Sequence, residues 1–267
     1  MSPPADYHTH TPLCKHASGE PEAYAARAVE RGLRELGFSD HSPMPPDYDP
    51  DWRMSYGQYA SYVGMVERCR KAWPQLSIKL GIEADYHPGT EPFVERILRE
   101  HPFDYVIGSI HYLGDWGFDN PELAHRFEGQ DLHELYARYY ALVEGLAGTG
   151  LYDILGHPDV IKKFGHRPSR DWESLERRAL EAVAKAGMAL DVNTSGLRRP
   201  AKEIYSSPRM LRTARELGIG ITFGSDAHEP KHVGEAFAEA VAAVKAAGYT
   251  TYRSYTRRRF EEVPLPA

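Results

Sequence analysis

A strand-like segment followed by a helix-like segment recurs seven times along this chain, and that alternation limits its possible folds more than any other feature. The helix-like stretches carry apolar residues three or four positions apart. Several strand-like stretches are continuously apolar, as in Tyr105-Val106-Ile107, which is typical of strands buried on both faces of a parallel sheet. Repeated strand–helix units predict a closed (β/α) barrel, and a doubly wound open sheet is the alternative.

The sequence also predicts the bounds of these units. We expect strands at residues 5–11, 33–41, 78–86, 103–112, 152–159, 188–195 and 220–228. We expect helices at residues 20–32, 56–72, 92–99, 131–146, 171–186, 208–217 and 234–247. The proline-rich residues 42–50 are expected to form a loop over the barrel mouth, and residues 114–130 a lid.

Two further expectations concern the last residues of the chain and the number of domains. Residues 250–267 are expected to form a short tail, with Arg257-Arg258-Arg259 as a solvated face. No linker rich in proline, glycine and serine interrupts the alternation, so we expect one domain over residues 1–267.

Composition excludes several classes of protein. With 42% hydrophobic residues among 267, the chain can bury a full core, yet it has no apolar run of 18 residues that would span a membrane. Only Cys14 and Cys69 are present and no secretion signal is evident, which predicts a cytoplasmic protein without a disulfide framework. A net charge of −6 argues against nucleic acid as a partner.

Side chains that bind metal ions gather at the ends of the predicted strands. His8 and His10 are two residues apart on one strand, so their side chains point to the same side. The candidate ligands are His8, His10, His16, His41, Glu83, His111, His157, Asp226 and His228. In a β/α barrel the carboxyl ends of the strands form one face, where active sites lie. We therefore expect all of these side chains around one mouth.

This set of ligands is too large for a single ion. One zinc ion usually takes four ligands, so two to three divalent metal ions are predicted. Imidazole suits zinc, iron or manganese, and carboxylates can bridge two ions. The pattern specifies neither the identity of each ion nor an oligomeric state.

Clustered metal ions favour hydrolysis of a phosphate ester, because they polarise phosphoryl oxygens and generate a hydroxide near neutral pH. The substrate class is therefore a small-molecule phosphate monoester. A covalent phosphoenzyme is not required, and the chain has neither a Cys-x5-Arg nor an Arg-His-Gly motif.

Several further residues are expected to assist the reaction. Arg198 follows the sixth strand and could hold a phosphate oxygen as a rigid fork. Lys162 and Lys163 could do the same, or could form a solvated basic turn. Asp226 or His228 is expected to protonate the leaving group. Asp226 is favoured because a coordinated histidine has no free proton at the metal side.

Asp40 precedes His41, so along an ideal strand its side chain points to the opposite face. We expect it to support a ligand rather than to bind an ion directly.

The motifs also resemble those of a known family. The segments that carry the resemblance are His8-Thr9-His10, His16, Ser39-Asp40-His41, Gly81-Ile82-Glu83, Ser109-Ile110-His111, Gly156-His157-Pro158 and Gly224-Ser225-Asp226-Ala227-His228. In order and spacing they are similar to the motif series of the PHP (polymerase and histidinol phosphatase) family, from residue 6 to about residue 235. Lys15 departs from the pattern, where a proline is expected.

The resemblance implies a distorted seven-stranded (β/α) barrel of the PHP type with a trinuclear metal site. One ion would be held by His8, His10, Glu83 and Asp226. Glu83 would bridge to a second ion, bound also by His111 and His157. The third ion would be held by His16, His41 and His228.

The resemblance is greatest to the stand-alone phosphatases of the family, through residues 11–16 and 191–198. It implies hydrolysis of L-histidinol phosphate to L-histidinol and phosphate, a step of histidine biosynthesis. Three alternatives remain at this stage. They are a PHP phosphoesterase for another small ester, a nuclease-like module serving a polymerase, and a non-catalytic metal-binding protein.

Overall fold

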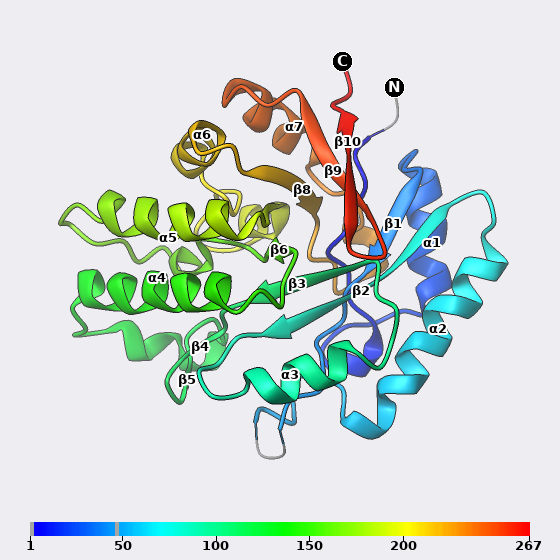
Figure 1. Ribbon diagram of the computed structural model, residues 1–267, viewed down its shortest axis with the longest axis horizontal. Helices are drawn as coiled ribbons and strands as arrows, with labels where there is room; N and C mark the ends of the chain where they lie inside the picture. Colours follow the sequence, from blue (N-terminus) through cyan, green and yellow to red (C-terminus); the bar gives the residue numbers. More distant parts are fainter. Residues whose placement is uncertain (1–2, 46–47) are drawn as a thin grey trace.

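Six parallel strands form the central sheet of the computed structural model, which describes residues 3–45 and 48–267 (Figure 1). Their order in the sheet follows the sequence and is β1 (Glu35–Phe38), β2 (Ser77–Asp85), β3 (Tyr105–Ser109), β6 (Ile154–Leu155), β7 (Ala189–Asn193) and β8 (Gly220–Gly224). A doubly wound sheet would reverse its strand order at one point, and this sheet does not. The prediction of a distorted β/α barrel is confirmed, with six regular strands rather than seven.

The first predicted strand, residues 5–11, is not a regular strand but lies between the two edges of the sheet. Tyr7 donates a backbone hydrogen bond to Phe223 of β8 (2.9 Å), and Asp6 accepts one from Gly37 of β1 (2.7 Å). The segment thus pairs with both edge strands in turn, through isolated bridges instead of a continuous ladder. It fills the seventh position of the distorted barrel and brings the His-x-His pair into its centre.

The predicted helices are confirmed, with ends shifted by a few residues. They are α1 (Pro21–Glu30), α2 (Tyr59–Ala72), α3 (Glu91–Leu98), α4 (Leu132–Gly148), α5 (Glu173–Ala186), α6 (Pro208–Glu216) and α7 (Phe237–Ala246). Local sequence explains where they begin. For example, the carboxylate of Asp131 accepts backbone hydrogen bonds from His133 and Glu134 and so caps α4. No helix of the described residues is long and apolar enough to cross a membrane.

The segment predicted to be a lid, residues 114–130, is folded. It begins in the turn of the hairpin that β4 (Tyr112–Leu113) and β5 (Trp116–Gly117) form, and it continues into the 3-10 helix η3 (Pro121–Phe127). The side chains of Trp116, Phe118 and Phe127 are buried, so apolar packing holds this segment in place. Of the other predicted loop, 42–50, residues 46 and 47 lie outside the described part of the chain.

The predicted tail is a β-hairpin that closes one end of the barrel. Strands β9 (Thr251–Thr256) and β10 (Arg259–Pro264) pair antiparallel. The backbone N–H of Arg258 donates to Asp104 (2.8 Å), and its guanidinium pairs with Asp153 (2.9 Å). Asp104 and Asp153 precede β3 and β6, so the hairpin covers the amino ends of the strands. The Arg257–Arg259 run is exposed, as expected, at the turn of this hairpin.

Tyrosine rings fill the barrel below the hairpin. Tyr7 and Tyr105 stack with ring centroids 4.6 Å apart, and Tyr255 of β9 packs at 6.3 Å from Tyr7. Gly37 and Gly81 leave the space for the ring of Tyr105, because a Cβ on either would overlap that ring. The amino end of the barrel is therefore a solid core, and the carboxyl end is left for the polar residues.

Substituting Gly81→Ala should destabilise the fold by about 1–3 kcal/mol, because the added methyl group overpacks the core against Tyr105. Gly148→Ala is the matched control, since Gly148 ends α4 with open space at its Cβ position. It should be neutral or stabilise by up to about 1 kcal/mol. Urea unfolding of the three proteins measures both effects. Equal stability of the Gly81→Ala variant and the parent would contradict this account of the core.

Candidate metal centre

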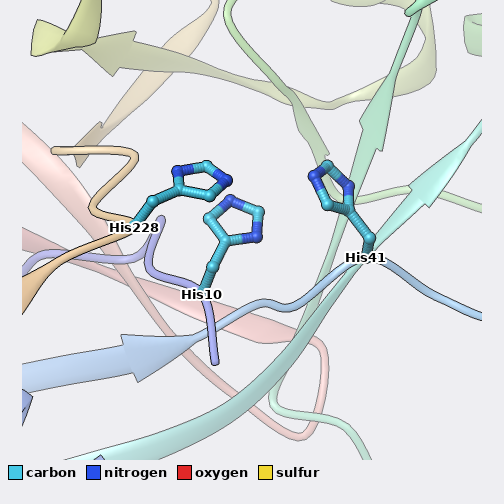
Figure 2. Close-up of side chains that lie close together, drawn as sticks. All are labelled: His10, His41 and His228. Atoms are coloured by element: carbon cyan, nitrogen blue, oxygen red, sulfur yellow. The ribbon is translucent and has the colours of Figure 1, made fainter. Parts of the chain in front are cut away.

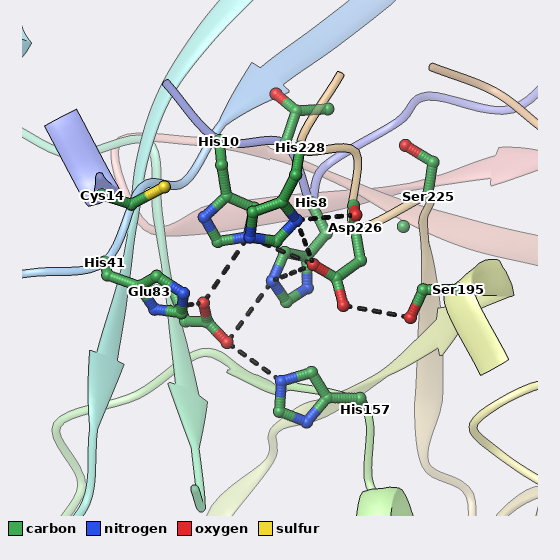
Figure 3. A network of polar contacts seen from close by, with 12 residues as sticks. His8, His10, Cys14, His41, Glu83, His157, Ser195, Ser225, Asp226 and His228 are labelled. Atoms are coloured by element: carbon green, nitrogen blue, oxygen red, sulfur yellow. Dashed lines mark hydrogen bonds and ion pairs between the residues drawn. The ribbon is translucent and has the colours of Figure 1, made fainter. Parts of the chain in front are cut away.

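All nine predicted ligands lie close together at the carboxyl ends of the strands. Figure 3 shows seven of them, namely His8, His10, His41, Glu83, His157, Asp226 and His228. The ligands surround a cavity of about 360 Å³, whose lining includes His16, His41, Glu83, His111, His157, Asp226 and His228. His8 and His10 lie beneath this lining and are fully buried. Glu83 is part of β2, and the other ligands of the later units follow their strands by two to four residues. The rule that carboxyl ends of parallel strands share one face therefore explains the cluster.

The first group of ligand atoms belongs to His8, His10 and Asp226, which lie within 4.8 Å of one another. The Nε2 of His10 is 3.2 Å from Oδ1 of Asp226. The Nε2 of His8 is 3.4 Å from Oε1 of Glu83. Tetrahedral zinc with bonds of about 2.0–2.2 Å separates its ligand atoms by about 3.3–3.6 Å. These side chains are therefore spaced as ligands of a common ion.

A second group shares the Oε1 atom of Glu83 with His8. This Oε1 atom is 3.1 Å from Nε2 of His157 and 3.7 Å from Nε2 of His111. The two imidazole Nε2 atoms are 3.1 Å apart. The Oε2 atom of Glu83 faces His41 at 2.9 Å. The carboxylate thus lies between several groups of ligands and can be shared between ions.

Closely packed histidine rings form the third group. His10 and His228 have ring centroids 4.0 Å apart, and His10 and His41 are separated by 4.6 Å (Figure 2). The ligand atoms of His16 lie instead with those of His228 and the buried Cys14. His10 therefore faces the first and third groups, a closer arrangement than the resemblance alone implies.

The buried polar atoms of this cluster are better placed to bind metal ions than to form hydrogen bonds with one another. The atoms without a hydrogen-bond partner among the described residues include His8 Nε2, His10 Nδ1, His10 Nε2, His41 Nδ1, Glu83 Oε2, His157 Nδ1 and His228 Nε2. Buried polar atoms are nearly always paired, and each unpaired one costs about 1–3 kcal/mol. Imidazole nitrogens and carboxylate oxygens are ligands of zinc, iron and manganese. The site is thus suited to divalent metal ions.

Carboxylates behind the histidines orient the imidazole rings. Oδ2 of Asp191 lies 2.7 Å from Nδ1 of His8, and Oδ1 of Asp85 lies 2.9 Å from Nδ1 of His111. Each contact leaves Nε2 of the ring facing the cluster, which is the common arrangement behind metal-binding histidines. Neither Asp85 nor Asp191 was predicted from the sequence to have this role. Asp191 lies within the buried, largely apolar strand β7, where the pattern does not distinguish a supporting carboxylate from a residue of the core.

Asp40, expected to support a ligand, is buried next to His10 and not next to the ring of His41. Its Oδ1 lies 3.5 Å from Nδ1 of His10 and accepts the backbone N–H of His41 at 2.9 Å. Its Oδ2 accepts from the hydroxyl of Thr11. These contacts tie the strand ends of the first and second units together.

The direction in which the pKa is shifted divides these histidines into two sets. Burial, with the neighbouring His41 and His10, lowers the pKa of His16 to about 3, and it holds the pKa of His228 well below the ordinary value. These rings are neutral near pH 7, the form that binds metal ions. Burial opposes protonation of His111 as well, but Asp85 outweighs it and raises the pKa of His111 to about 10. A divalent ion would replace this proton as the compensating charge.

The structure does not bring Arg198 and Lys162 to the cavity, which differs from the expectation. Arg198 donates to the carbonyl of Ser225 (2.7 Å) and pairs with Glu235 (3.1 Å). Lys162 is 4% exposed and bonds to Asp159 (2.7 Å) in the 3-10 turn η4 (Val160–Lys162). The tight turns after the strands direct both cations away from the cavity, and spacing along the sequence does not reveal that.

Lys163 does line the cavity, as expected for one of the two adjacent lysines. Its ammonium pairs with Asp119 at 3.0 Å. The lining also includes Trp52, Arg199 and Ser195, which sequence analysis did not select. Trp52 lies in the loop after β1, and Ser195 and Arg199 lie in and just after the 3-10 helix η5 (Thr194–Arg198), where periodicity gives no signal.

Fold and site together define a metal-binding β/α-barrel protein, and comparison with known proteins places it within that class. Residues 6–195 match the model of the PHP domain, and residues 208–245 match that of a PHP-associated region. The chain belongs to the PHP domain family.

Individual relatives agree with this assignment. The chain is 49% identical to a probable histidinol-phosphatase of Deinococcus radiodurans, over 92% of this chain and 94% of the relative. It is 32% identical to the histidinol-phosphatase of Bacillus subtilis, over 87% and 96% of the two chains. The solved histidinol phosphate phosphatase of Lactococcus lactis, complexed with zinc, L-histidinol and phosphate, has the same fold. Its TM-score is 0.85 at 22% identity, over 98% of this chain and 100% of that one.

Substituting Asp191→Asn should lower the affinity for divalent metal about 10- to 100-fold, because the amide no longer holds the ring of His8 as an ionised acceptor. Asp153→Asn is the control, since Asp153 pairs with Arg258 at the opposite end of the barrel. Chelator competition with zinc, followed by metal analysis of each protein, measures the change. The same affinity in both variants would exclude this role for Asp191.

Proposed function

We propose that this protein is a metal-dependent phosphoric monoester hydrolase that converts L-histidinol phosphate to L-histidinol and phosphate. The observation that carries the proposal is the cluster of buried, unpaired imidazole and carboxylate atoms beneath the cavity lined by Lys163. The two curated relatives named above support the substrate, since both are histidinol-phosphatases by name. The reaction would belong to histidine biosynthesis.

We further propose two to three divalent ions for this site. The first would be held by His8, His10, Glu83 and Asp226, the second by Glu83, His111 and His157, and the third by His16, His41 and His228. Zinc is the metal named for the Lactococcus structure, and the donor set also suits iron and manganese. Such ions supply Lewis-acid chemistry, in which they neutralise phosphoryl oxygens and acidify water.

Lys163 is the cation that we propose for binding the phosphate, because it lines the cavity and its only ion pair, among the described residues, is with Asp119. Arg199, also in the lining, is a second candidate. The charged groups of Arg198 and Lys162 are held by other residues, so these two side chains are not available as phosphate ligands. Trp52, Tyr112 and Glu229 line the cavity and could contact the imidazole and amine of the substrate.

Asp226 is the residue that we propose to deliver a proton to the leaving alkoxide. Its Oδ1 faces His10, whereas its Oδ2 accepts a hydrogen bond from Ser195 at 3.0 Å. Burial would raise the pKa of Asp226, but the nearby histidines hold it well below the usual value. The carboxyl is thus ionised at rest and must take up a proton before it can donate one. His228 is the alternative, although its Nδ1 lies 3.1 Å from the carbonyl of Asp226 and its Nε2 faces the cluster.

We infer that the chain works as one catalytic unit, because the ligands come from segments between residues 8 and 228. A cytoplasmic location is part of the proposal. Cys14 and Cys69 are free and buried, which fits a reducing compartment.

Phosphate release from L-histidinol phosphate tests this function directly. The metal-loaded protein is compared with a chelated sample and assayed on a panel of other monoesters and a model diester. Strong, chelator-sensitive preference for L-histidinol phosphate is expected. Preference for another ester would contradict the proposed substrate but support the proposed class of reaction. Metal binding without any turnover would indicate a non-catalytic metal-binding protein.

Substituting Lys163→Ala should raise the KM for the phosphate ester about 10- to 100-fold, because one hydrogen bond to a charged group is worth about 1.5–3 kcal/mol. The metal content should not change, since Lys163 contacts Asp119 and no candidate ligand. The exposed Lys71 of α2 provides the control variant Lys71→Ala. Steady-state kinetics with metal analysis separates the two quantities. An unchanged KM would remove Lys163 from the phosphate site.

A further inference from the structure

Arg53 is a buried cation at the edge of the metal centre that the proposed reaction does not use. It is 3% exposed and lies in the loop between β1 and α2, next to Trp52. Its Nη2 pairs with Asp85 at 2.8 Å and with Asp49 at 3.3 Å. Its Nη1 donates to the backbone carbonyl of Ser42 at 3.3 Å.

The carboxylate of Asp85 connects this cation to a candidate metal ligand. Oδ2 of Asp85 faces Arg53, and Oδ1 faces Nδ1 of His111 at 2.9 Å. The opposite nitrogen of the ring, Nε2, lies 3.1 Å from Nε2 of His157. Asp85 itself is fully buried. A continuous path of contacts therefore runs from the loop to the second group of ligand atoms.

We propose that Arg53 is a positioning residue, which acts through Asp85 to fix the ring of His111 and so sets the affinity of the second metal position. This inference rests on the proposed metal role of His111. A buried carboxylate is costly without a cationic partner. Without Arg53, the carboxylate of Asp85 would lose the contact that fixes its Oδ2 atom, so it would be free to turn and would hold the ring of His111 less firmly.

Direct contact between Arg53 and a substrate phosphate is the competing role. Arg53 borders the cavity, but Asp85, Asp49 and the carbonyl of Ser42 hold its two terminal nitrogens. Its guanidinium also lies 5.1 Å from the ring centroid of Tyr48. The carboxylates of Asp85 and Asp49 already compensate the charge of Arg53, so the guanidinium attracts a further anion less strongly. The geometry thus favours a fixed structural charge over a ligand-binding one.

The neighbouring Trp52 links the loop that contains Arg53 to another part of the cluster of candidate ligands. Its ring centroid is 4.9 Å from that of His16, and the residue is 37% exposed. Two consecutive residues of one loop thus contact His16 directly and His111 through Asp85. By holding the loop, Arg53 also keeps Trp52 against His16.

The variants Arg53→Met and Arg53→Lys test the proposal against the control Arg70→Met. Arg70 pairs with Asp104 (3.3 Å) near the amino ends of the strands, far from the ligands. For each protein, zinc stoichiometry and affinity are measured by chelator competition, and Tm is measured with and without zinc. Kinetics are recorded at limiting and at saturating zinc.

For Arg53→Met we expect one zinc ion per chain to bind at least about tenfold more weakly, in line with other changes behind metal-binding histidines. Saturating zinc should restore much of kcat, and KM for the ester should stay nearly unchanged. Arg53→Lys keeps the positive charge but loses the planar guanidinium with its several N–H donors. The zinc affinity of this variant should therefore fall between those of the parent and Arg53→Met. Arg70→Met should lower Tm without changing zinc affinity.

Two outcomes would overturn the proposal. Unchanged zinc affinity with a raised KM would make Arg53 a substrate contact, and unchanged affinity with only a lower Tm would make its role purely structural. If Arg53→Met does not fold, Asp85→Asn takes its place, because it breaks the same path at its centre with nearly the same shape. Zinc affinity does not depend on which ester is cleaved, so failure of the proposed substrate leaves this test intact.

Discussion

The buried carboxylate of Glu83 is the charge on which the arrangement of the site depends. Glu83 is 1% exposed and belongs to β2, which lies between β1 and β3 in the sheet. Its two oxygens face His157 and His41 at 3.1 and 2.9 Å. An isolated buried carboxylate would be prohibitively costly, so the surrounding imidazoles and any ion that they bind must compensate it. The strand that positions this charge therefore positions the groups of ligands around it.

The amino end of the barrel stabilises the fold, and the carboxyl end holds the candidate metal ligands. At the amino end, Tyr7, Tyr105 and Tyr255 pack beneath the β9–β10 hairpin. At the carboxyl end, His157 and Asp226 have positive φ values of 26° and 52°, which residues other than glycine rarely adopt. Such strain persists only where the surrounding structure imposes it, and it is typical of functional sites. The solid core at one end supports strained ligands at the other.

The sequence was sufficient to predict the seven α-helices, the six strands of the central sheet and the set of residues that meet at the site. His8, Glu83 and Asp226 could be placed together because strand ends of a parallel barrel share one face. The directions of Arg198 and Lys162 could not be predicted, because short 3-10 turns determine them. Asp191 was overlooked because it lies within an apolar strand, and the final hairpin because its exposed strand β10 has no apolar alternation.

Charge balance gives an independent reason for several ions. The imidazoles contact the carboxylates of Asp40, Glu83, Asp85, Asp191 and Asp226. Arg53 offsets one of these charges, so with neutral imidazoles about four remain. Two divalent ions would cancel them and leave a neutral site, which attracts a phosphate dianion only weakly. The charge of Lys163 at the cavity wall is compensated by Asp119, so the positive charge that the ester requires would have to come from a further ion. The number of supporting carboxylates thus explains why the site needs several positive charges, which divalent ions would supply.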